Sequence, residues 1–270
     1  MTLTSSDPGP WLRRYHPAGP GAARLVCFPH AGGSASFFFP VSARLSPALD
    51  VVAVQYPGRQ DRRAEPNIDS IAGIADAVLP ALRPLGDGPL AFFGHSMGAV
   101  VAYEVALRLE RAGAAPLVRV FVSGRRAPSR VRVGTVHERD DGGVIAELQS
   151  LSGTDSSLLD DAEARQMILP AVRADYRAIE TYRDTPGRML SCPVTALIGD
   201  SDPQVTAEEA GDWARHTTGP FDLRLFPGGH FYLQEHAGQV IQLLSGELTA
   251  RTGTVPATGC GDQQRRPACE

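Results

Sequence analysis

The amino-acid sequence predicts an α/β fold in which a mostly parallel central sheet is flanked by helices. Six short runs are rich in β-branched or other apolar residues, and the first three of them are apolar on successive residues, as strands buried on both faces are. These runs are residues 25–28, 51–54, 90–93, 118–122, 194–198 and 223–226. Segments with helical spacing lie between them, and this alternation is typical of parallel strands joined by helices. One connection is much longer than the others and suggests an insertion.

The first two helix candidates lie on either side of the third apolar run. Ile71, Ile74 and Val78 recur with helical spacing, and Asp69 could cap the start of that helix. The segment Val100–Leu109 forms the next candidate and is followed by Gly113, a residue that commonly ends helices.

The long connection runs from residue 124 to 192, whereas a crossover needs only a dozen or more residues. It contains two helix-like stretches, at about 142–151 and 158–182, so we expect a helical lid over one end of the sheet. The predicted core is then residues 1–123 and 193–248. Residues 249–270 are polar and lack periodicity, which predicts a disordered tail.

The composition is that of an ordinary globular protein. Of 270 residues, 43% are hydrophobic and 21% charged. The net charge is −4 and the sequence has no basic stripe, which argues against nucleic acid as the main partner. The spacing of the four cysteines suggests neither a disulfide framework nor a zinc site, and Cys27 and Cys192 are expected in the core. Without a signal peptide or an apolar stretch long enough to cross a membrane, the sequence predicts a soluble, cytoplasmic protein.

The strongest motif is the pentapeptide 94–98, Gly-His-Ser-Met-Gly. It follows one apolar run and precedes a helix candidate, which is the strand-turn-helix context of the G-x-S-x-G nucleophile elbow in α/β hydrolases. The glycines permit the sharp turn that lifts the serine hydroxyl above the sheet. This context predicts Ser96 as a nucleophile.

A serine nucleophile needs a base, and His230 is the preferred candidate. It follows the last apolar run in Pro-Gly-Gly-His-Phe, and it satisfies the chain order of serine, acid, histidine. His236 falls in a helical segment and His216 near a helix end, so both are expected at the surface, while His137 belongs to the insertion.

The acid is expected after the run 194–198, in Gly-Asp-Ser-Asp-Pro-Gln-Val. Asp202 is preferred because it fits the G-x-x-D-x-x-V pattern common at this place in the fold, and Asp200 stays open as the alternative. The acid would orient the imidazole and stabilise its charged form.

An oxyanion hole needs two backbone N–H donors near the serine. Met97, directly after the nucleophile, is expected to supply one. The second is assigned to Ala31, with Gly32 as the alternative, in the Gly-rich loop after the first apolar run. His30 is expected to fix this loop rather than to take part in catalysis.

Taken together, these residues resemble the discrete type II thioesterases that accompany polyketide and nonribosomal peptide synthases. The resemblance extends from about Arg13 to Leu248, and the segment after the second run, Tyr-Pro-Gly-Arg at 56–59, is its most specific part. The other matching stretches are residues 25–33, 94–99, 199–203 and 228–231.

The resemblance implies a serine thioesterase that removes stalled or aberrant acyl groups from the phosphopantetheine arm of acyl or peptidyl carrier proteins. It implies no cofactor and no metal, since the substrate itself carries the phosphopantetheine. Acidic carrier proteins suggest an arginine-lined docking face, and a mobile lid could restrict acyl length. The docking candidates are Arg59, Arg62, Arg63, Arg125 and Arg126.

Three other functions stay open at this point. One is a chain-releasing or cyclising thioesterase, which has the same triad but another acceptor. Another is a medium-chain fatty acyl thioesterase or a carboxylesterase. The last is a catalytically silent fold that binds a partner, because a fold alone does not establish activity.

Overall fold

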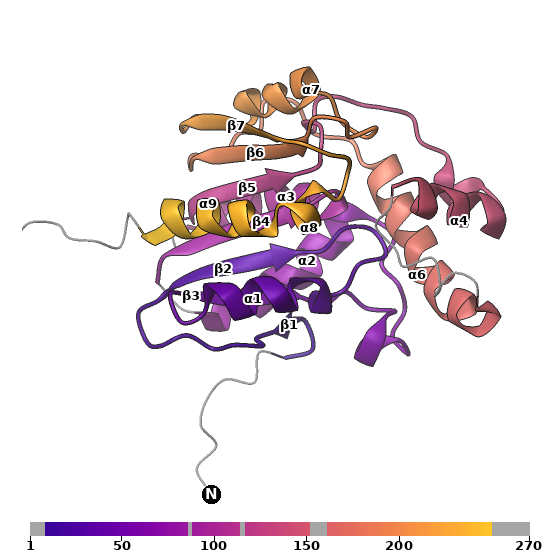
Figure 1. Cartoon of the computed structure of the whole chain (residues 1–270), viewed down its shortest axis with the longest axis horizontal. Coiled ribbons are helices and arrows are strands. Elements are labelled where there is room, and N and C mark those ends of the chain that lie inside the picture. The colour runs from indigo at the N-terminus through magenta and orange to yellow at the C-terminus, as the bar shows by residue number, and fades with distance from the viewer. Residues whose placement is uncertain (1–8, 86–87, 114–116, 152–160, 250–270) are drawn as a thin grey trace, which may run out of the picture.

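The computed structural model describes residues 9–85, 88–113, 117–151 and 161–249. Its centre is one seven-stranded sheet in the order β1-β3-β2-β4-β5-β6-β7, drawn in Figure 1. The strands are β1 (Leu12–Arg13), β2 (Ala23–Phe28), β3 (Leu49–Val54), β4 (Leu90–His95), β5 (Leu117–Ser123), β6 (Val194–Gly199) and β7 (Phe221–Phe226). All six predicted runs lie in β2 to β7, which are mutually parallel, so the predicted fold class is confirmed.

The additional strand, β1, was not predicted. It pairs antiparallel with β3 at the edge of the sheet, with Leu12 opposite Val54. A strand of two residues is too short to show a periodic pattern, because alternation is recognised only over about four or more residues.

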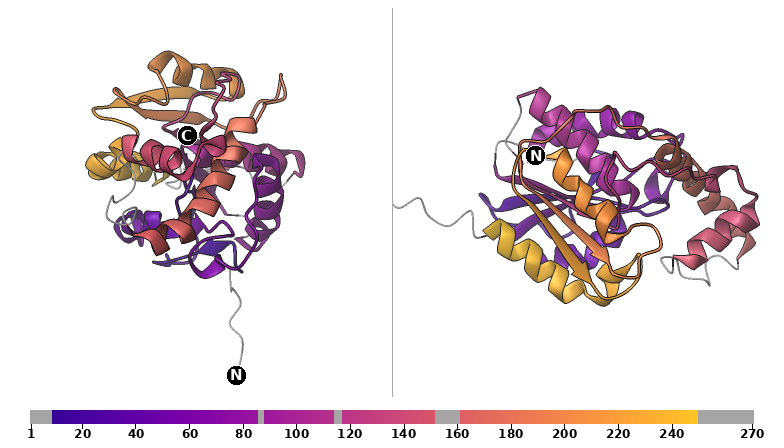
Figure 2. Two further views of the ribbon diagram at one scale, coloured as in Figure 1. Left: turned by 90° about the vertical axis from the view of Figure 1, so that its right-hand side faces the viewer. Right: turned by 90° about the horizontal axis from the view of Figure 1, so that it is seen from above.

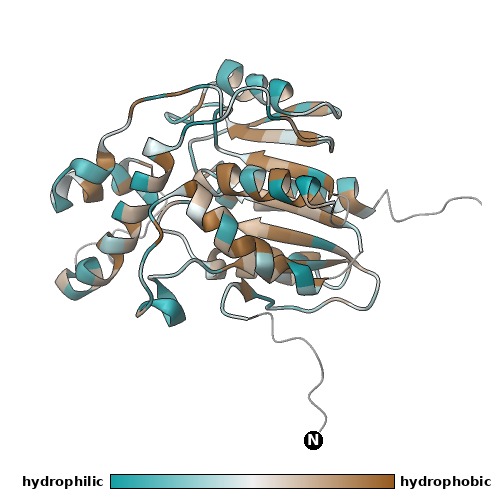
Figure 3. Ribbon diagram, turned by 180° about the vertical axis from the view of Figure 1, so that it is seen from behind, coloured by the Kyte–Doolittle hydropathy of each residue, from teal (hydrophilic) through white to brown (hydrophobic). Residues whose placement is uncertain are grey.

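Helices cover both faces of the sheet (Figures 1 and 2). Two of them, α2 and α3, pack with each other on one face, while α1 and α9 pack with each other on the opposite face. Their bounds are α1 (Phe39–Leu45), α2 (Ile71–Leu82), α3 (Met97–Arg111) and α9 (Ala237–Thr249). Apolar residues line the sheet faces under these helices, and polar residues lie on their outer sides (Figure 3).

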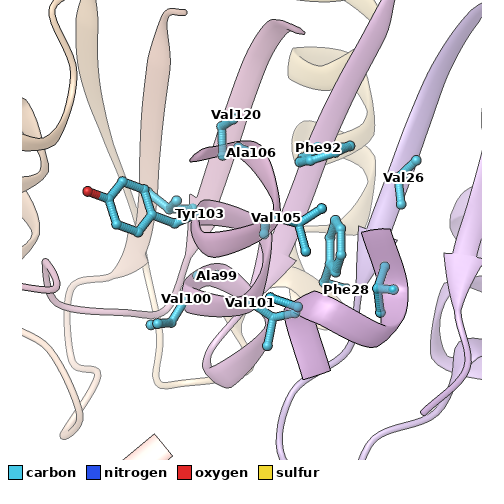
Figure 4. Packing of buried hydrophobic residues seen from close by; sticks show 14 of the residues in the cluster. Val26, Phe28, Phe92, Ala99, Val100, Val101, Tyr103, Val105, Ala106 and Val120 are labelled. Carbon is cyan, nitrogen blue, oxygen red and sulfur yellow. The ribbon is translucent and has the colours of Figure 1, made fainter. Parts of the chain in front are cut away.

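Helix α3 packs closely on the strands beneath it. Phe28 and Phe92 meet edge to face, with ring centroids 5.1 Å apart, and Val101 and Val105 of α3 lie beside them in Figure 4. All four side chains are buried. This packing holds the N-terminus of α3, and with it the predicted nucleophile, against the ends of β2 and β4.

Two helix boundaries differ from the prediction. The cap of α2 is Ser70, not Asp69, because the Ser70 hydroxyl accepts a hydrogen bond from the Gly73 N–H at 3.2 Å. The helix predicted from Val100 begins earlier, at Met97, and continues to Arg111. The first turn of α3 contains Gly98 and Ala99, which carry no amphipathic signal.

The long connection between β5 and β6 contains α4 (Asp141–Ser150) and α6 (Ala162–Thr181). Asp140 and Asp161 cap these helices by accepting hydrogen bonds from their first-turn N–H groups. Val144, Leu148, Leu169 and Val172 form a small core of their own with Val136. The pair lies beyond the end of the sheet in Figures 1 and 2, on the side where β2, β4 and β5 end. Residues 158–160, predicted to begin the second helix, lie outside the described residues.

The end of the chain departs slightly from the predicted tail. Thr249, predicted as its first residue, is instead the last residue of α9, and residues 250–270 lie outside the described part of the chain. Within the described ranges, no helix is both long and apolar enough to cross a bilayer. Cys27 and Cys192 are buried and unpaired, as expected, whereas Cys260 and Cys269 are outside the described residues.

Candidate active site

Ser96 lies at the sharp turn between β4 and α3. Its φ of 54° is in the left-handed region, where a non-glycine residue is strained. A Cβ on Gly94 would lie 2.2 Å from the Gly98 carbonyl oxygen, and one on Gly98 would lie 2.1 Å from the Phe28 carbonyl oxygen. Only glycine fits at either position, so both motif glycines are required by the close approach of backbone to backbone. Ser96 itself is partly exposed.

His230 and Asp202 meet through a hydrogen bond. The His230 Nδ1 lies 2.8 Å from the Asp202 Oδ2, and the two residues are 3% and 8% exposed. Asp202 is on the loop after β6 and His230 on the loop after β7, so adjacent parallel strands deliver both to the same edge of the sheet. With Nδ1 engaged by the carboxylate, Nε2 is the ring nitrogen left for proton transfer.

The other acid candidate, Asp200, has a different position. It is exposed, and its Oδ1 accepts hydrogen bonds from the Gly228 N–H at 3.0 Å and the Ser201 hydroxyl at 2.8 Å. These bonds lower the pKa of its carboxyl group. Asp200 therefore ties together the loops that carry Asp202 and His230, and it does not contact the imidazole.

Gly124, directly after β5, connects the serine and histidine sides of the site. The Ser96 N–H donates to the Ser123 carbonyl at 2.7 Å, and a Cβ on Gly124 would lie 3.3 Å from the His230 Cε1. The Ser96 hydroxyl itself makes no hydrogen bond to any described residue, His230 included. Serine–histidine hydrogen bonds are often longer without substrate, so this geometry does not separate the two groups functionally.

A chain of hydrogen bonds lies beside the His230 ring, and no local motif predicted it. His95 Nδ1 lies 3.0 Å from the Ser123 hydroxyl, which lies 2.7 Å from the Tyr232 hydroxyl. His95 is fully buried, and its ring lies 5.0 Å from that of His230. Burial, and then the positive charge that His230 can carry, hold the pKa of His95 well below its ordinary value. His95 is therefore a neutral packing partner of His230.

The predicted oxyanion loop follows β2. The Gly33 N–H donates to the His30 carbonyl at 2.9 Å, which closes the turn, and the His30 ring packs against Phe37 and Phe231. These contacts agree with a loop-fixing role for His30. The Gly32 N–H is already engaged, because it donates to Asp175 at 2.8 Å.

Asp175 comes from the lid helix α6 and forms a buried ion pair with Arg59. Its two carboxylate oxygens accept from the two terminal nitrogens of Arg59 at 2.6 and 2.8 Å, and Arg59 also donates to the Gly33 carbonyl at 3.0 Å. Asp175 is 1% exposed and Arg59 9%. One turn earlier on α6, the Val172 Cγ2 atom would lie 2.9 Å from a Cβ placed on Gly32. The lid thus contacts the oxyanion loop at two adjacent points.

This ion pair corrects the predicted docking face. Arg59 is buried against Asp175, and Arg62 is 5% exposed, with its guanidinium 4.1 Å from the Trp11 ring. Arg126 is also buried, at 8%. Of the five arginines considered for docking, three are therefore internal.

The prediction for His216 is also wrong. It is 4% exposed, and its ring nitrogens lie 3.2 Å from the Tyr103 hydroxyl and 2.9 Å from the Ser129 hydroxyl. A short 3-10 helix, residues 212–216, turns it inward beside Trp213. Among the described residues, no group of three His, Cys, Asp or Glu side chains could hold a metal ion.

The comparisons with known proteins all lead to thioesterases. The family model described as "Thioesterase domain" matches residues 23–248. A "Probable cadicidin biosynthesis thioesterase" of Streptomyces griseus is 55% identical over 240 residues, which are 89% of this chain and 66% of that protein. "Thioesterase PikA5" of Streptomyces venezuelae is 49% identical over 252 residues, covering 93% of this chain and 90% of that protein.

Solved structures give the same result. The structure described as the type II thioesterase BorB from the borrelidin biosynthetic cluster superposes with a TM-score of 0.84 at 52% identity. The superposition covers 91% of this chain and 99% of that one. The RedJ thioesterase from the prodiginine pathway of Streptomyces coelicolor reaches 0.79 at 40% identity, covering 86% of this chain and 89% of that one.

Proposed function

Because the chain belongs to the thioesterase domain family, we propose that Ser96, His230 and Asp202 hydrolyse acyl thioesters on the phosphopantetheine arm of acyl or peptidyl carrier proteins. The names of its relatives support an editing role, the removal of stalled or aberrant acyl groups in polyketide or nonribosomal peptide synthesis. The observation that carries the proposal is the 2.8 Å Asp202–His230 contact at the sheet edge where the strained elbow presents Ser96.

The reaction proceeds through an acyl-enzyme. The Ser96 hydroxyl attacks the thioester carbonyl while His230 Nε2 takes its proton, and Asp202 stabilises the resulting imidazolium. The C–S bond breaks and the pantetheine thiol leaves with the proton from His230. Water then attacks the Ser96 ester with His230 again as base, which releases a carboxylic acid and restores the serine. These steps need no cofactor beyond the arm that the substrate carries.

The tetrahedral intermediates place a negative charge on the former carbonyl oxygen. We assign its stabilisation to the N–H groups of Met97 and Ala31. Met97 is the first residue of α3, where backbone N–H groups have no partner within the helix and the helix dipole favours negative charge. Support for Ala31 over Gly32 comes from Asp175, which already accepts the Gly32 N–H.

The lid formed by α4 and α6 is the part of the chain that we expect to limit acyl length. Its contact with the oxyanion loop, through Val172 and Asp175, means that a lid movement would disturb the site directly. A cytoplasmic location and carrier proteins as partners complete the proposal, and both stay predictions.

The experiment is a turnover comparison across acyl-loaded carrier proteins, acyl-CoA and oxygen esters at equal concentration, with Ser96→Ala as control. We expect carrier-bound substrates to have the largest kcat/KM, and Ser96→Ala to reduce it by at least about 10³-fold. A preference for oxygen esters would favour a carboxylesterase. A cyclic product from a hydroxyl-bearing acyl chain would indicate a cyclising enzyme, and failure of Ser96 to react with a fluorophosphonate would indicate a silent fold.

A further inference from the structure

A narrow cleft lies between the core and the lid helix α6. One wall consists of residues from the segment 125–132, which continues from β5, and the other of residues 179–183, at the end of α6. Val100, one turn after the nucleophile in α3, also lines it. The cleft therefore reaches α3 one helical turn after Ser96.

Arg125 is the charged residue nearest the site in this cleft. The Ser96 N–H is bonded to the Ser123 carbonyl, and Arg125 follows Ser123 by two residues, so its Cα lies at most about 7 Å from that of Ser123. An extended arginine side chain adds a similar length. A group bound to the Arg125 guanidinium can thus belong to the same substrate molecule as the carbonyl attacked by Ser96.

The Arg125 guanidinium is partly buried and has no hydrogen bond or ion pair with any described residue. Burial lowers its pKa, the charges of Arg126 and Arg132 act in the same direction, and Tyr176 and Glu180 oppose them more weakly. Arginine nevertheless stays protonated at neutral pH. A buried cation without a partner is costly, because it loses hydration and gains no compensating charge. An anionic ligand would remove that cost.

The acidic groups near the cleft do not neutralise it. Glu180 accepts hydrogen bonds from the backbone N–H groups of Val136 and His137 and contacts the His137 ring at 2.5 Å. Arg126 donates to the carbonyl oxygens of Gln204 and Arg130, not to a carboxylate. Glu180 therefore acts on Arg125 only through space, and neither Arg125 nor Arg126 has a hydrogen bond to a carboxylate among the described residues.

We infer that this cleft is an anion subsite in which Arg125 binds an oxyanion of the acyl-phosphopantetheine substrate. This inference rests on the proposed thioesterase function and deepens it by naming what the substrate must carry. Two groups supply the required chemistry: the phosphate at the end of the pantetheine arm, and a carboxylate on the acyl chain itself. Either would accept the paired N–H donors of the guanidinium.

Three substrates separate the two sources: propionyl-pantetheine, propionyl-phosphopantetheine and malonyl-pantetheine. They are compared in the wild type, in Arg125→Gln and Arg125→Lys, and in Arg63→Gln. Arg63 is a matched control. Although it is a docking candidate for carrier proteins, none of the three substrates carries one, and its exposed guanidinium also lacks a partner among the described residues and lies outside the cleft. Because Arg125→Gln breaks no side-chain hydrogen bond or ion pair among the described residues, and the Trp213 indole donates to the Arg125 backbone carbonyl, the variant should fold. Its Tm is measured alongside.

In the wild type, we expect kcat/KM for one anionic substrate to exceed that for propionyl-pantetheine. Arg125→Gln should abolish this advantage, a loss of about 10-fold or more, and leave propionyl-pantetheine within about twofold. Arg125→Lys should restore part of it, and Arg63→Gln should change nothing. A higher kcat/KM for propionyl-phosphopantetheine alone would show that Arg125 binds the phosphate of the arm. A higher kcat/KM for malonyl-pantetheine alone would show that it binds a carboxylate of the acyl chain.

Two results would overturn the subsite. One is an equal loss of kcat/KM in Arg125→Gln for all three substrates, and the other is a wild-type kcat/KM that is no higher for either anionic substrate than for propionyl-pantetheine. Absence of propionyl-pantetheine hydrolysis by the wild type would instead count against the proposed function. A binding measurement makes the two failures distinct: phosphopantetheine without an acyl group should bind the wild type more tightly than Arg125→Gln by calorimetry, whether or not the protein is active.

Discussion

At the scale of single residues, the shape of the elbow requires two positions without a side chain, Gly94 and Gly98. Gly94 and Gly98 face each other across the elbow, and the Phe28 carbonyl occupies the space that a Cβ on Gly98 would take. The strained φ of Ser96 persists because these contacts hold α3 tightly against β2 and β4. A substitution at these contacts therefore tests what maintains the strained turn without changing a residue of the predicted triad.

Gly98→Ala tests this support. A Cβ 2.1 Å from a backbone oxygen cannot be accommodated by a side-chain rotation, so the elbow must move. We expect kcat to fall about 100-fold, as misplacement by about 1 Å can cause, and the free energy of unfolding to fall by about 1–3 kcal/mol. Steady-state kinetics and urea unfolding measure the two effects.

The matched control is Gly246→Ala. Gly246 is exposed inside α9, and nothing lies within 4 Å of a Cβ there. This substitution should raise the free energy of unfolding by about 0.5–1 kcal/mol, because glycine is a poor helix residue, and leave kcat unchanged. Unaltered kinetics in Gly98→Ala would show that the elbow tolerates the shift.

The sequence supports predictions at this scale only where the signal is local. The motif around Ser96 can be read because strand, turn and helix follow one another in the chain. Arg59 could not be assigned to an internal ion pair, since its partner Asp175 is 116 residues away. His216 was misplaced for the same reason: its partner Tyr103 comes from α3, 113 residues earlier.

At the scale of elements, α6 connects the lid to the catalytic edge. Two of its residues, Val172 and Asp175, contact the loop after β2, and the carboxylate of Asp175 serves both the Gly32 N–H and Arg59. Helical periodicity indicated an amphipathic helix in this region. It did not indicate that a charged residue on its buried side contacts the loop after β2, because periodicity cannot specify what a helix packs against.

The ion pair predicts that removing one charge destabilises the protein more than removing both. Asp175→Leu leaves Arg59 buried and unpaired, so we expect a loss of about 3–5 kcal/mol in the free energy of unfolding. Arg59→Met together with Asp175→Leu should recover most of this loss, since neither charge remains buried. The double variant should still have a reduced kcat, by about 10-fold, because Gly32 has lost its acceptor and the loop is less well placed.

A second ion pair on the same helix provides the control. Arg177 and Asp69 also join α6 to the core, at 3.2 Å, but both are more than half exposed. Arg177→Met should therefore change the free energy of unfolding by no more than about 0.5–1 kcal/mol and leave kcat intact. If the double variant at 59 and 175 had full kcat, the buried pair would hold the lid without positioning the loop.

At the scale of the whole molecule, three histidines have lowered pKa values: the rings of His30 and His95 pack together beside His230, whereas His216 lies against Tyr103 and Trp213. Burial is the main cause in each case: it lowers the pKa of His30 to about 3, holds that of His95 well below its ordinary value, and lowers that of His216. The positive charges that His230 and Arg59 can present to His30 act in the same direction. The grouping of His30 and His95 beside His230 follows from the sheet topology. It could not be predicted from seven histidines scattered along the sequence.

This grouping predicts that the protein loses stability as the pH falls below about 6.5. The unfolded histidines take up protons near that value, while the folded ones resist until much lower pH, so the unfolded state binds more protons in between. The contribution of His30 is complete above about pH 6.5 and is lost as the pH falls toward about 3. Between pH 7.5 and 5, His30 alone accounts for up to about 2 kcal/mol.

His30→Leu isolates this contribution, because the buried His30 Nδ1 has no partner that the substitution would leave unsatisfied. Urea unfolding at pH 7.5 and 5 gives the loss of stability on acidification for each protein. We expect the loss to be smaller in His30→Leu than in the wild type by up to about 2 kcal/mol, with the difference confined to acidic pH. Equal losses in the two proteins would mean that His30 is protonated as readily in the folded state as in the unfolded chain.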